Sequence, residues 1–177
     1  STGVTVSGFI DASAYMDFTG VPEAQKQLAV GVDEVEVNFS STPVSGLTVR
    51  TDLNIFPSGG VIDADSLVEQ AYLEYYFGGG SDGFSLTVGK VNAPIGIEAL
   101  DPVDMYQYSK GLLFSFATPS NLTGVFAGYS DGAISAKVWV ANDWDMPKAA
   151  DLPNFGGRFE YAFEELGHVG LSTTFEQ

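Results

Sequence analysis

Carboxylates are the side chains of this sequence that could do the most chemistry. The 177 residues include 23 Asp and Glu, against 7 Lys and Arg, one His and no Cys. Carboxylate oxygens are ligands that Ca²⁺ prefers, and the segments 63–65 and 143–145 each hold two aspartates two positions apart. Acidic loop residues are more often simply solvated, so Ca²⁺ binding by these loops stays open. The sequence predicts no metal site and no cofactor.

Catalytic patterns are not recognisable in the sequence. Without cysteine there is neither a thiolate nucleophile nor a disulfide, and no Gly-x-Ser-x-Gly marks a serine nucleophile. The single histidine, His168, directly follows a tight turn, where a place at the turn edge or in a lumen explains it better than catalysis. The sequence therefore predicts a protein that is not an enzyme.

The composition combines a low charged fraction with a strongly acidic balance. Charged residues make up 17% and the net charge is −16, whereas about a quarter of a typical soluble domain is charged. Seven scattered cations form no basic stripe, which argues against nucleic-acid binding. No apolar run approaches the roughly 18 residues of a membrane helix. The opening Ser1-Thr2-Gly3 is typical of a processed secretory protein.

Alternation with period two is the dominant pattern, and it predicts an all-β, antiparallel fold. In one segment Val35 and Val37 alternate with Glu34 and Glu36, so that one face is apolar and the other polar. The sequence predicts about nine such strands, over 4–16, 34–39, 47–55, 67–77, 84–91, 122–129, 133–141, 155–163 and 168–175.

Short and long connections alternate between these strands. Short turns are expected at 44–46, 78–83, 131–132 and 165–167, and long connections at 19–29, 57–66, 92–121 and 142–154. Asp131-Gly132 predicts a two-residue hairpin that pairs Tyr129 with Ile134. In an up-and-down meander every second connection lies at the same end, so one rim has tight turns and the other long loops. Bacterial outer-membrane barrels are built in this way, which predicts a transmembrane β-barrel.

A soluble extracellular β-sandwich, such as an adhesin-type module, or a lipocalin-like barrel is the alternative fold. Its outer surface should be rich in Lys and Glu, whereas the polar face here mixes Ser, Thr, Gly and Tyr with a few charges. Aromatic residues also fall on the apolar face beside short turns, where a barrel carries its membrane-interface girdle. These residues are Phe77, Phe84, Tyr129 and Phe163.

From Val88 onward the sequence resembles a known family. The resemblance is carried in order by 88–98 (VGKVNAPIGIE), Asp101-Pro102, 108–114 (YSKGLLF), 117–119 (ATP), 122–124 (LTG) and 140–145 (VANDWD). This succession is similar to the OmpL-like β-barrel porins of bacterial outer membranes. Asp143 stands where the family usually has Gly, and Lys110 where a second Ser is common.

The resemblance implies a porin-like channel in the outer membrane, in contact with its lipid. Members of that family are about twice as long as this chain, so the resemblance implies an N-terminal half. We expect residues 1–177 to form a single β-barrel domain that is part of a larger barrel of about 16 strands, because bacterial single-chain barrels have an even strand number. Two partners stay open: further copies of this chain, in a trimer, or another protein of the cell envelope.

If the apolar face meets lipid, the polar face lines a lumen. Acids outnumber bases there, which predicts passive diffusion of small hydrophilic solutes or ions with a mild preference for cations. The alternative is a structural barrel with a filled lumen that binds a partner protein, in which these charges pair locally. The predicted pore-lining residues are Asp11, Glu34, Glu36, Arg50, Asp52, Glu74, Lys137, Arg158 and Glu160, beside Gln70 and Tyr72.

The connection 92–121 is the longest and carries the most suggestive charges. Asp101-Pro102 is typical of a helix start, so a short helix is expected over 101–109. Long loops in compact domains are usually functional. The loop could narrow a lumen, or it could pack over the mouth or against a partner. Its candidate constriction residues are Glu98, Asp101, Asp104 and Lys110.

Overall fold

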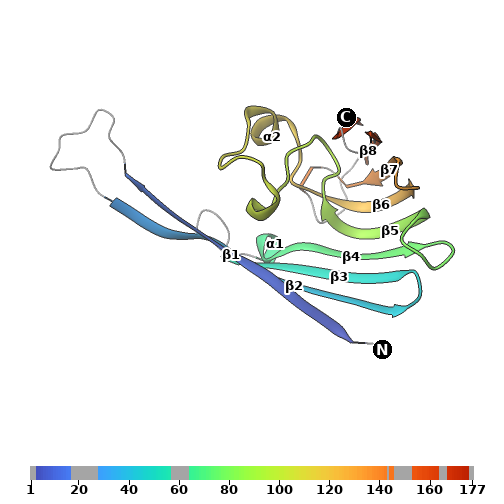
Figure 1. Cartoon of the computed structure of the whole chain (residues 1–177), viewed down its shortest axis with the longest axis horizontal. Helices are drawn as coiled ribbons and strands as arrows, with labels where there is room; N and C mark the ends of the chain where they lie inside the picture. Colours follow the sequence, from blue (N-terminus) through green and yellow to red (C-terminus); the bar gives the residue numbers. More distant parts are fainter. Residues whose placement is uncertain are drawn as a thin grey trace.

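The computed structural model describes residues 3–16, 28–56, 64–142, 144–145, 153–163 and 167–175. These residues form one antiparallel sheet of nine strands arranged in chain order, so the predicted all-β meander is confirmed (Figure 1). The sheet is open, with β1 and β9 at its two ends. The strands are β1 (Val4–Met16), β2 (Leu28–Val44), β3 (Leu47–Phe56), β4 (Val68–Tyr76), β5 (Gly83–Asn92), β6 (Asn121–Ser130), β7 (Ile134–Ala141), β8 (Asn154–Phe163) and β9 (Gly167–Phe175).

Helical structure is confined to three short segments in the described ranges. These are α1 (Ala64–Leu67), the 3₁₀ turn η2 (Pro102–Asp104) and α2 (Leu112–Ala117). None of the helices described is long and apolar enough to cross a membrane. The longest pairing joins β1 to β2, and this hairpin projects beyond the rest of the sheet (Figure 1).

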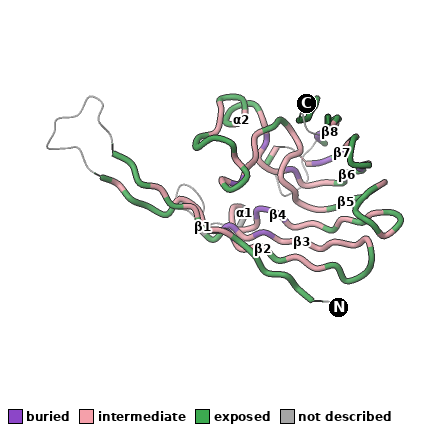
Figure 2. Tube along the Cα trace, viewed as in Figure 1, coloured by how far each residue is buried: buried purple, intermediate pink, exposed green. Residues whose placement is uncertain are grey.

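The two faces of the sheet differ as the alternation predicts. On β7 Val138 points outward with 59% of its surface exposed, while the neighbouring Trp139 is buried on the inner face. Exposed Val, Leu and Phe residues repeat on the outer face from β1 to β9. No second sheet covers this face within the described part of the chain, so the structure does not support a β-sandwich. Figure 2 shows buried positions on β2, β3 and β4 near α1 and on β7.

The turn after β6 corrects a sequence prediction. The loop contains three residues, from Asp131 to Ala133, and it pairs Tyr129 with Ala136 instead of Ile134. The cause is the Asp131 carboxylate, whose Oδ1 accepts hydrogen bonds from the backbone N–H of Ala133 (3.1 Å) and Ile134 (2.8 Å). This side-chain turn competes with the expected two-residue hairpin.

The turn between β2 and β3 is one residue shorter than expected. Val44 pairs with Leu47, so the turn between β2 and β3 has two residues, and Gly46 adopts the positive φ of 80° that the turn requires. A register shift between Ser41 and Val44 absorbs the missing residue, so Ser41 pairs with Val49 and the side chains of β2 and β3 keep their predicted faces. Phe163 pairs with Gly167, so Gly167, expected as the last residue of a turn, already belongs to β9; residues 164–166 lie outside the described residues.

The apolar core lies on the inner face, between the sheet and the start of the long loop. It contains Leu122, Phe126, Trp139 and Ala141, with Val91, Ala93 and Ile95 packed against them. Gly156 makes room for the Trp139 ring, because a Cβ at this position would lie 2.3 Å from ring atom Cζ2. The indole N–H of Trp139 donates to Asn154 Oδ1 at 3.0 Å, which satisfies its buried polar atom.

The long loop runs from residue 93 to residue 120 across the inner face. The helix expected over 101–109 is wrong: only Pro102–Asp104 forms a 3₁₀ turn, and α2 follows later. Asp101 makes no capping hydrogen bond. Its buried side chain instead contacts Glu69, so it is not available to cap a helix.

Candidate functional site

The polar inner face of the sheet holds the predicted pore-lining residues. Cross-strand partners share a face, and the observed pairs Asp11–Glu34 and Lys137–Arg158 place charged side chains side by side. Glu74 also lies there and accepts a hydrogen bond from Thr87 Oγ1 at 3.0 Å. The structure thus brings the predicted set to one face.

Arg50 and Asp52 form a local ion pair on β3. Arg50 Nε lies 2.9 Å from both carboxylate oxygens of Asp52, and Gln70 Nε2 donates to Oδ2 at 2.6 Å. Asp52 is fully buried. Three donations satisfy this carboxylate, so this part of the inner face is neutral and firmly paired.

Arg158 links the sheet to the long loop. Its Nη2 lies 2.5 Å from Glu160 Oε1, and its Nη1 donates to the main-chain oxygen of Gly96 at 2.6 Å. Gly96 in turn donates its N–H to Ser172 Oγ on β9 at 3.1 Å. Two strands therefore hold the start of the loop against the inner face.

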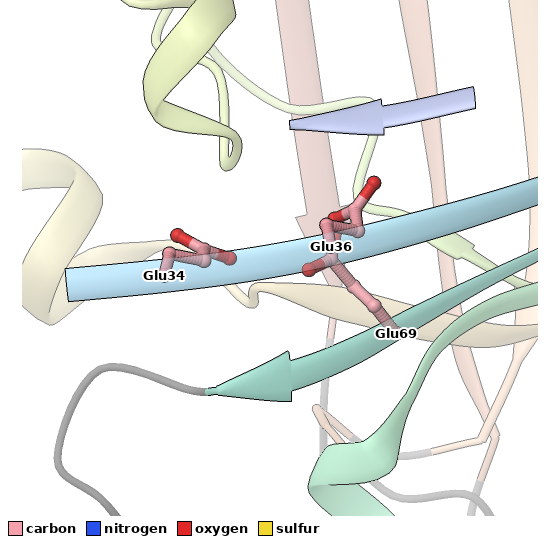
Figure 3. Close-up of side chains that lie close together, drawn as sticks. All are labelled: Glu34, Glu36 and Glu69. Atoms are coloured by element: carbon pink, nitrogen blue, oxygen red, sulfur yellow. The ribbon is translucent and has the colours of Figure 1, made fainter. Parts of the chain in front are cut away.

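A cluster of carboxylates lies where β2 and β4 face the loop. Glu34, Glu36 and Glu69 each present an oxygen within 4.8 Å of the others (Figure 3). The loop residue Asp101 contacts Glu69 from above the sheet. We call these four residues the carboxylate cluster.

Glu69 could not be predicted from the alternation pattern because it lies at a β-bulge. Asp52 pairs with Gln70, whereas the next residue, Leu53, pairs with Val68, so Glu69 is the extra residue. Both Glu69 and Gln70 are buried as a result, although alternation would put them on opposite faces. A bulge leaves no clear signal in a strand of this composition.

Asparagines accompany the cluster along a row across the sheet. Asn38 Nδ2 donates to Glu36 Oε1 at 2.6 Å, and Asn92 Nδ2 donates to Glu69 Oε1 at 3.1 Å. Asn54 Nδ2 donates to Glu34 Oε1. Each of the three cluster carboxylates on the sheet thus receives one asparagine donor, which fixes its position and leaves its other oxygen free to act as an acceptor.

The four loop residues predicted at a constriction have different roles. Glu98 holds the loop together, accepting from the Gly111 N–H at 2.8 Å and from Gln107 Nε2. Asp104 is exposed. Asp101 is buried, and burial raises its pKa to about 7, with the Glu69 charge acting in the same direction.

Lys110 is the loop residue that brings positive charge near the cluster. Its Nζ lies 4.7 Å from the centroid of the Phe114 ring, and burial lowers the pKa of its ammonium group. It borders a hollow of about 330 Å³ together with Asp11, Asp33 and Glu34. Lys110 and Asp101 are therefore the two predicted constriction residues that face the wall of the sheet.

The predicted interface aromatics gather at the short-turn end of the outer face. Phe84 and Tyr129 pack with ring centroids 5.0 Å apart, on the neighbouring strands β5 and β6. Phe77 contacts Tyr75, and Phe163 contacts Tyr161, in edge-on geometry. This is the position that interfacial aromatic belts occupy in membrane barrels.

The acidic loop segments named as Ca²⁺ candidates are only partly described. Asp63 and Asp143 lie outside the described residues. Asp145 accepts a hydrogen bond at its Oδ1 from the Asn121 N–H at 2.7 Å, which ties the end of β7 to the start of β6.

Comparison with known proteins identifies a family. A family model described as "Putative beta-barrel porin-2, OmpL-like" matches residues 3–176. No curated protein and no solved structure matches the chain.

Proposed function

The chain belongs to the OmpL-like β-barrel porin family, and from this membership we propose that its sheet lines a pore in the bacterial outer membrane. Small hydrophilic solutes and ions diffuse through this pore, cations more readily than anions. No chemical reaction and no cofactor take part.

The observation that carries the proposal is the separation of the two faces. The outer face exposes apolar side chains from β1 to β9, and these suit the acyl chains of lipid. The inner face carries the charged and amide side chains, which suit water. Strands of 8 to 17 residues are close to or longer than the roughly 9–11 residues that a tilted strand needs to cross a bilayer.

The preference for cations follows from which inner charges are neutralised. Arg50 is paired with Asp52, and Arg158 with Glu160, so these two cations contribute little net field. Glu34, Glu36 and Glu69 have amide donors, while Lys110 is the cation beside them on the loop. Excess negative charge in a narrow aqueous path raises the local concentration of cations.

The long loop supports the further proposal of a constriction. It lies against the inner face through Ala93 and Ile95 and through the Arg158–Gly96 hydrogen bond. The loop thereby occupies space that would otherwise be open lumen. Its inward charges, Asp101 and Lys110, would meet a passing ion.

Conductance across a planar bilayer tests the proposal. The full-length protein, refolded in detergent and added to the bilayer, is expected to give discrete current steps with a cation-selective zero-current potential. A well-folded protein that inserts but passes no current would instead support a structural barrel with a filled lumen.

A further inference from the structure

The carboxylate cluster has the donor spacing of a calcium shell. Oxygens of Glu34, Glu36 and Glu69 lie within 4.8 Å of one another. Ca²⁺ binds oxygen at about 2.3–2.6 Å, so oxygens on opposite sides of the ion are up to about 5 Å apart. Figure 3 shows these side chains converging from two strands of the sheet. The three carboxylates could therefore share one ion with only small side-chain adjustments.

Unpartnered oxygens beside the cluster give independent support. Asn54 is only 8% exposed, and its Oδ1 accepts no hydrogen bond. Its Nδ2 donates to Glu34, and its backbone pairs with Glu36, so its amide group lies beside both carboxylates. A buried amide oxygen without a donor is costly. A cation in this space would satisfy it, because amide oxygens are also ligands for Ca²⁺.

Two carboxylate oxygens of the cluster are also buried without a hydrogen-bond donor. Glu36 is 2% exposed and Asp101 is 9% exposed, yet Glu36 Oε2 and Asp101 Oδ1 accept no hydrogen bond. They reach the cluster from opposite sides, one from the sheet and one from the loop. Several buried acceptors without donors at one place indicate an ion more directly than any one of them alone.

The charge balance points in the same direction. Arg50 is engaged with Asp52, Lys90 Nζ donates to the Val68 oxygen next to Glu69 at 2.6 Å, and Lys110 lies over the Phe114 ring. Two monovalent ammonium groups do not offset four buried or half-buried carboxylates. Like charges held this close repel one another unless a proton or a cation lies among them.

We propose that Glu34, Glu36 and Glu69, with Asn54 and Asp101, bind a divalent cation, Ca²⁺ in preference to Mg²⁺. The preference follows from the ligands: an all-protein set of oxygens on three strands and a loop suits the larger ion, whereas Mg²⁺ demands a tighter octahedron and keeps several waters. Because Asp101 belongs to the loop, the bound ion would also fasten the loop to the sheet. Ca²⁺ binding at this site does not require that the protein conducts ions.

Calorimetric titration of the refolded full-length protein, freed of metal by a chelator, tests the site. CaCl₂ is expected to bind at one equivalent, and MgCl₂ at least tenfold more weakly. Glu69→Gln and Asp101→Asn should each weaken Ca²⁺ binding by at least tenfold. Asp101→Asn changes only a loop residue, so it tests the site even if Glu69→Gln fails to fold.

Glu74→Gln is the matched control. It removes a carboxylate from the same strand and face as Glu69, but one that accepts from Thr87 outside the cluster. Its Ca²⁺ affinity should stay within twofold of that of the unaltered chain. The proposal is overturned if the unaltered chain shows no saturable Ca²⁺ binding, if Mg²⁺ binds as tightly, or if Glu74→Gln weakens binding as much as Asp101→Asn.

Discussion

The Arg158 guanidinium donates a 2.6 Å hydrogen bond to the main-chain oxygen of Gly96, a residue 62 positions earlier in the chain. This contact joins strand β8 to the long loop. A guanidinium already paired with Glu160 is held in one orientation, so it can fix the path of the loop where it leaves the apolar core.

Arg158→Ala should release the start of the long loop. The variant loses a charge-assisted hydrogen bond, an interaction of about 1.5–3 kcal/mol, and leaves the Gly96 oxygen to water. We expect faster proteolysis within residues 93–120 and a larger single-channel conductance. Lys137→Ala is the control, since Lys137 lies on the same face opposite Arg158. Equal cleavage rates in both variants would show that Arg158 does not hold the loop.

Gly156→Ala should destabilise the sheet where Trp139 crosses β8. The added Cβ would lie 2.3 Å from the indole ring and 2.4 Å from the Thr173 backbone oxygen. Overpacking of this kind costs about 1–3 kcal/mol. Gly157→Ala is the matched control, because its Cβ would meet its nearest neighbours at 3.6 Å. Urea unfolding in detergent should separate the two variants, and equal midpoints would contradict the packing of Trp139.

A charge on the outer face should impair folding into lipid. Val138→Arg places a cation on the apolar face, at a cost of about 2–4 kcal/mol near the bilayer midplane. Ser135→Arg, on the inner face opposite Glu160, should fold with nearly normal yield. The measurement is the folded fraction in lipid vesicles as a function of urea. Normal folding of Val138→Arg would indicate that this face meets water.

Calcium binding should weaken as the pH falls through about 7. Burial raises the pKa of Asp101 to about 7, and Ca²⁺ requires the deprotonated carboxylate. For one group titrating there, the affinity should fall roughly tenfold between pH 8 and pH 6. The charged groups around Asp101 are Glu34, Glu36, Asp52, Glu69, Asp104 and Lys110.

Without calcium the same pKa shift should make stability depend on pH. The folded chain keeps a proton on Asp101 that the unfolded chain releases near its ordinary pKa of 3.8. The contribution to stability is therefore fully present below about 4 and is lost as the pH rises through about 7. Asp101→Asn should flatten this part of the profile, measured by urea unfolding in the presence of a chelator. If Asp101→Asn leaves the pH dependence of stability unchanged, groups other than Asp101 cause it.

The strands and their faces could be predicted from the sequence because alternation is a local property. Val138 and Lys137 are assigned to opposite faces from their neighbours alone, and the structure confirms both positions. The turn at Asp131 could not be predicted in the same way. Its carboxylate competes for backbone N–H groups, and that competition changes the register by two residues.

The carboxylate cluster could be predicted only in part. Glu34 and Glu36 follow from alternation, whereas Glu69 reaches the inner face through a bulge and Asp101 through the path of the loop. That path depends on contacts far apart in the sequence, such as Arg158 with Gly96. Local patterns carry no information about contacts of this range.

The zero-current potential of the protein in a planar bilayer under a KCl gradient tests the pore most directly. We expect stepwise currents and a zero-current potential whose sign shows that K⁺ passes more readily than Cl⁻. Glu34→Gln combined with Glu36→Gln should move this potential toward zero, because it removes two carboxylates whose hydrogen-bond partners are uncharged amides. The absence of current across the bilayer, or a zero-current potential of the opposite sign, would contradict a cation-preferring pore.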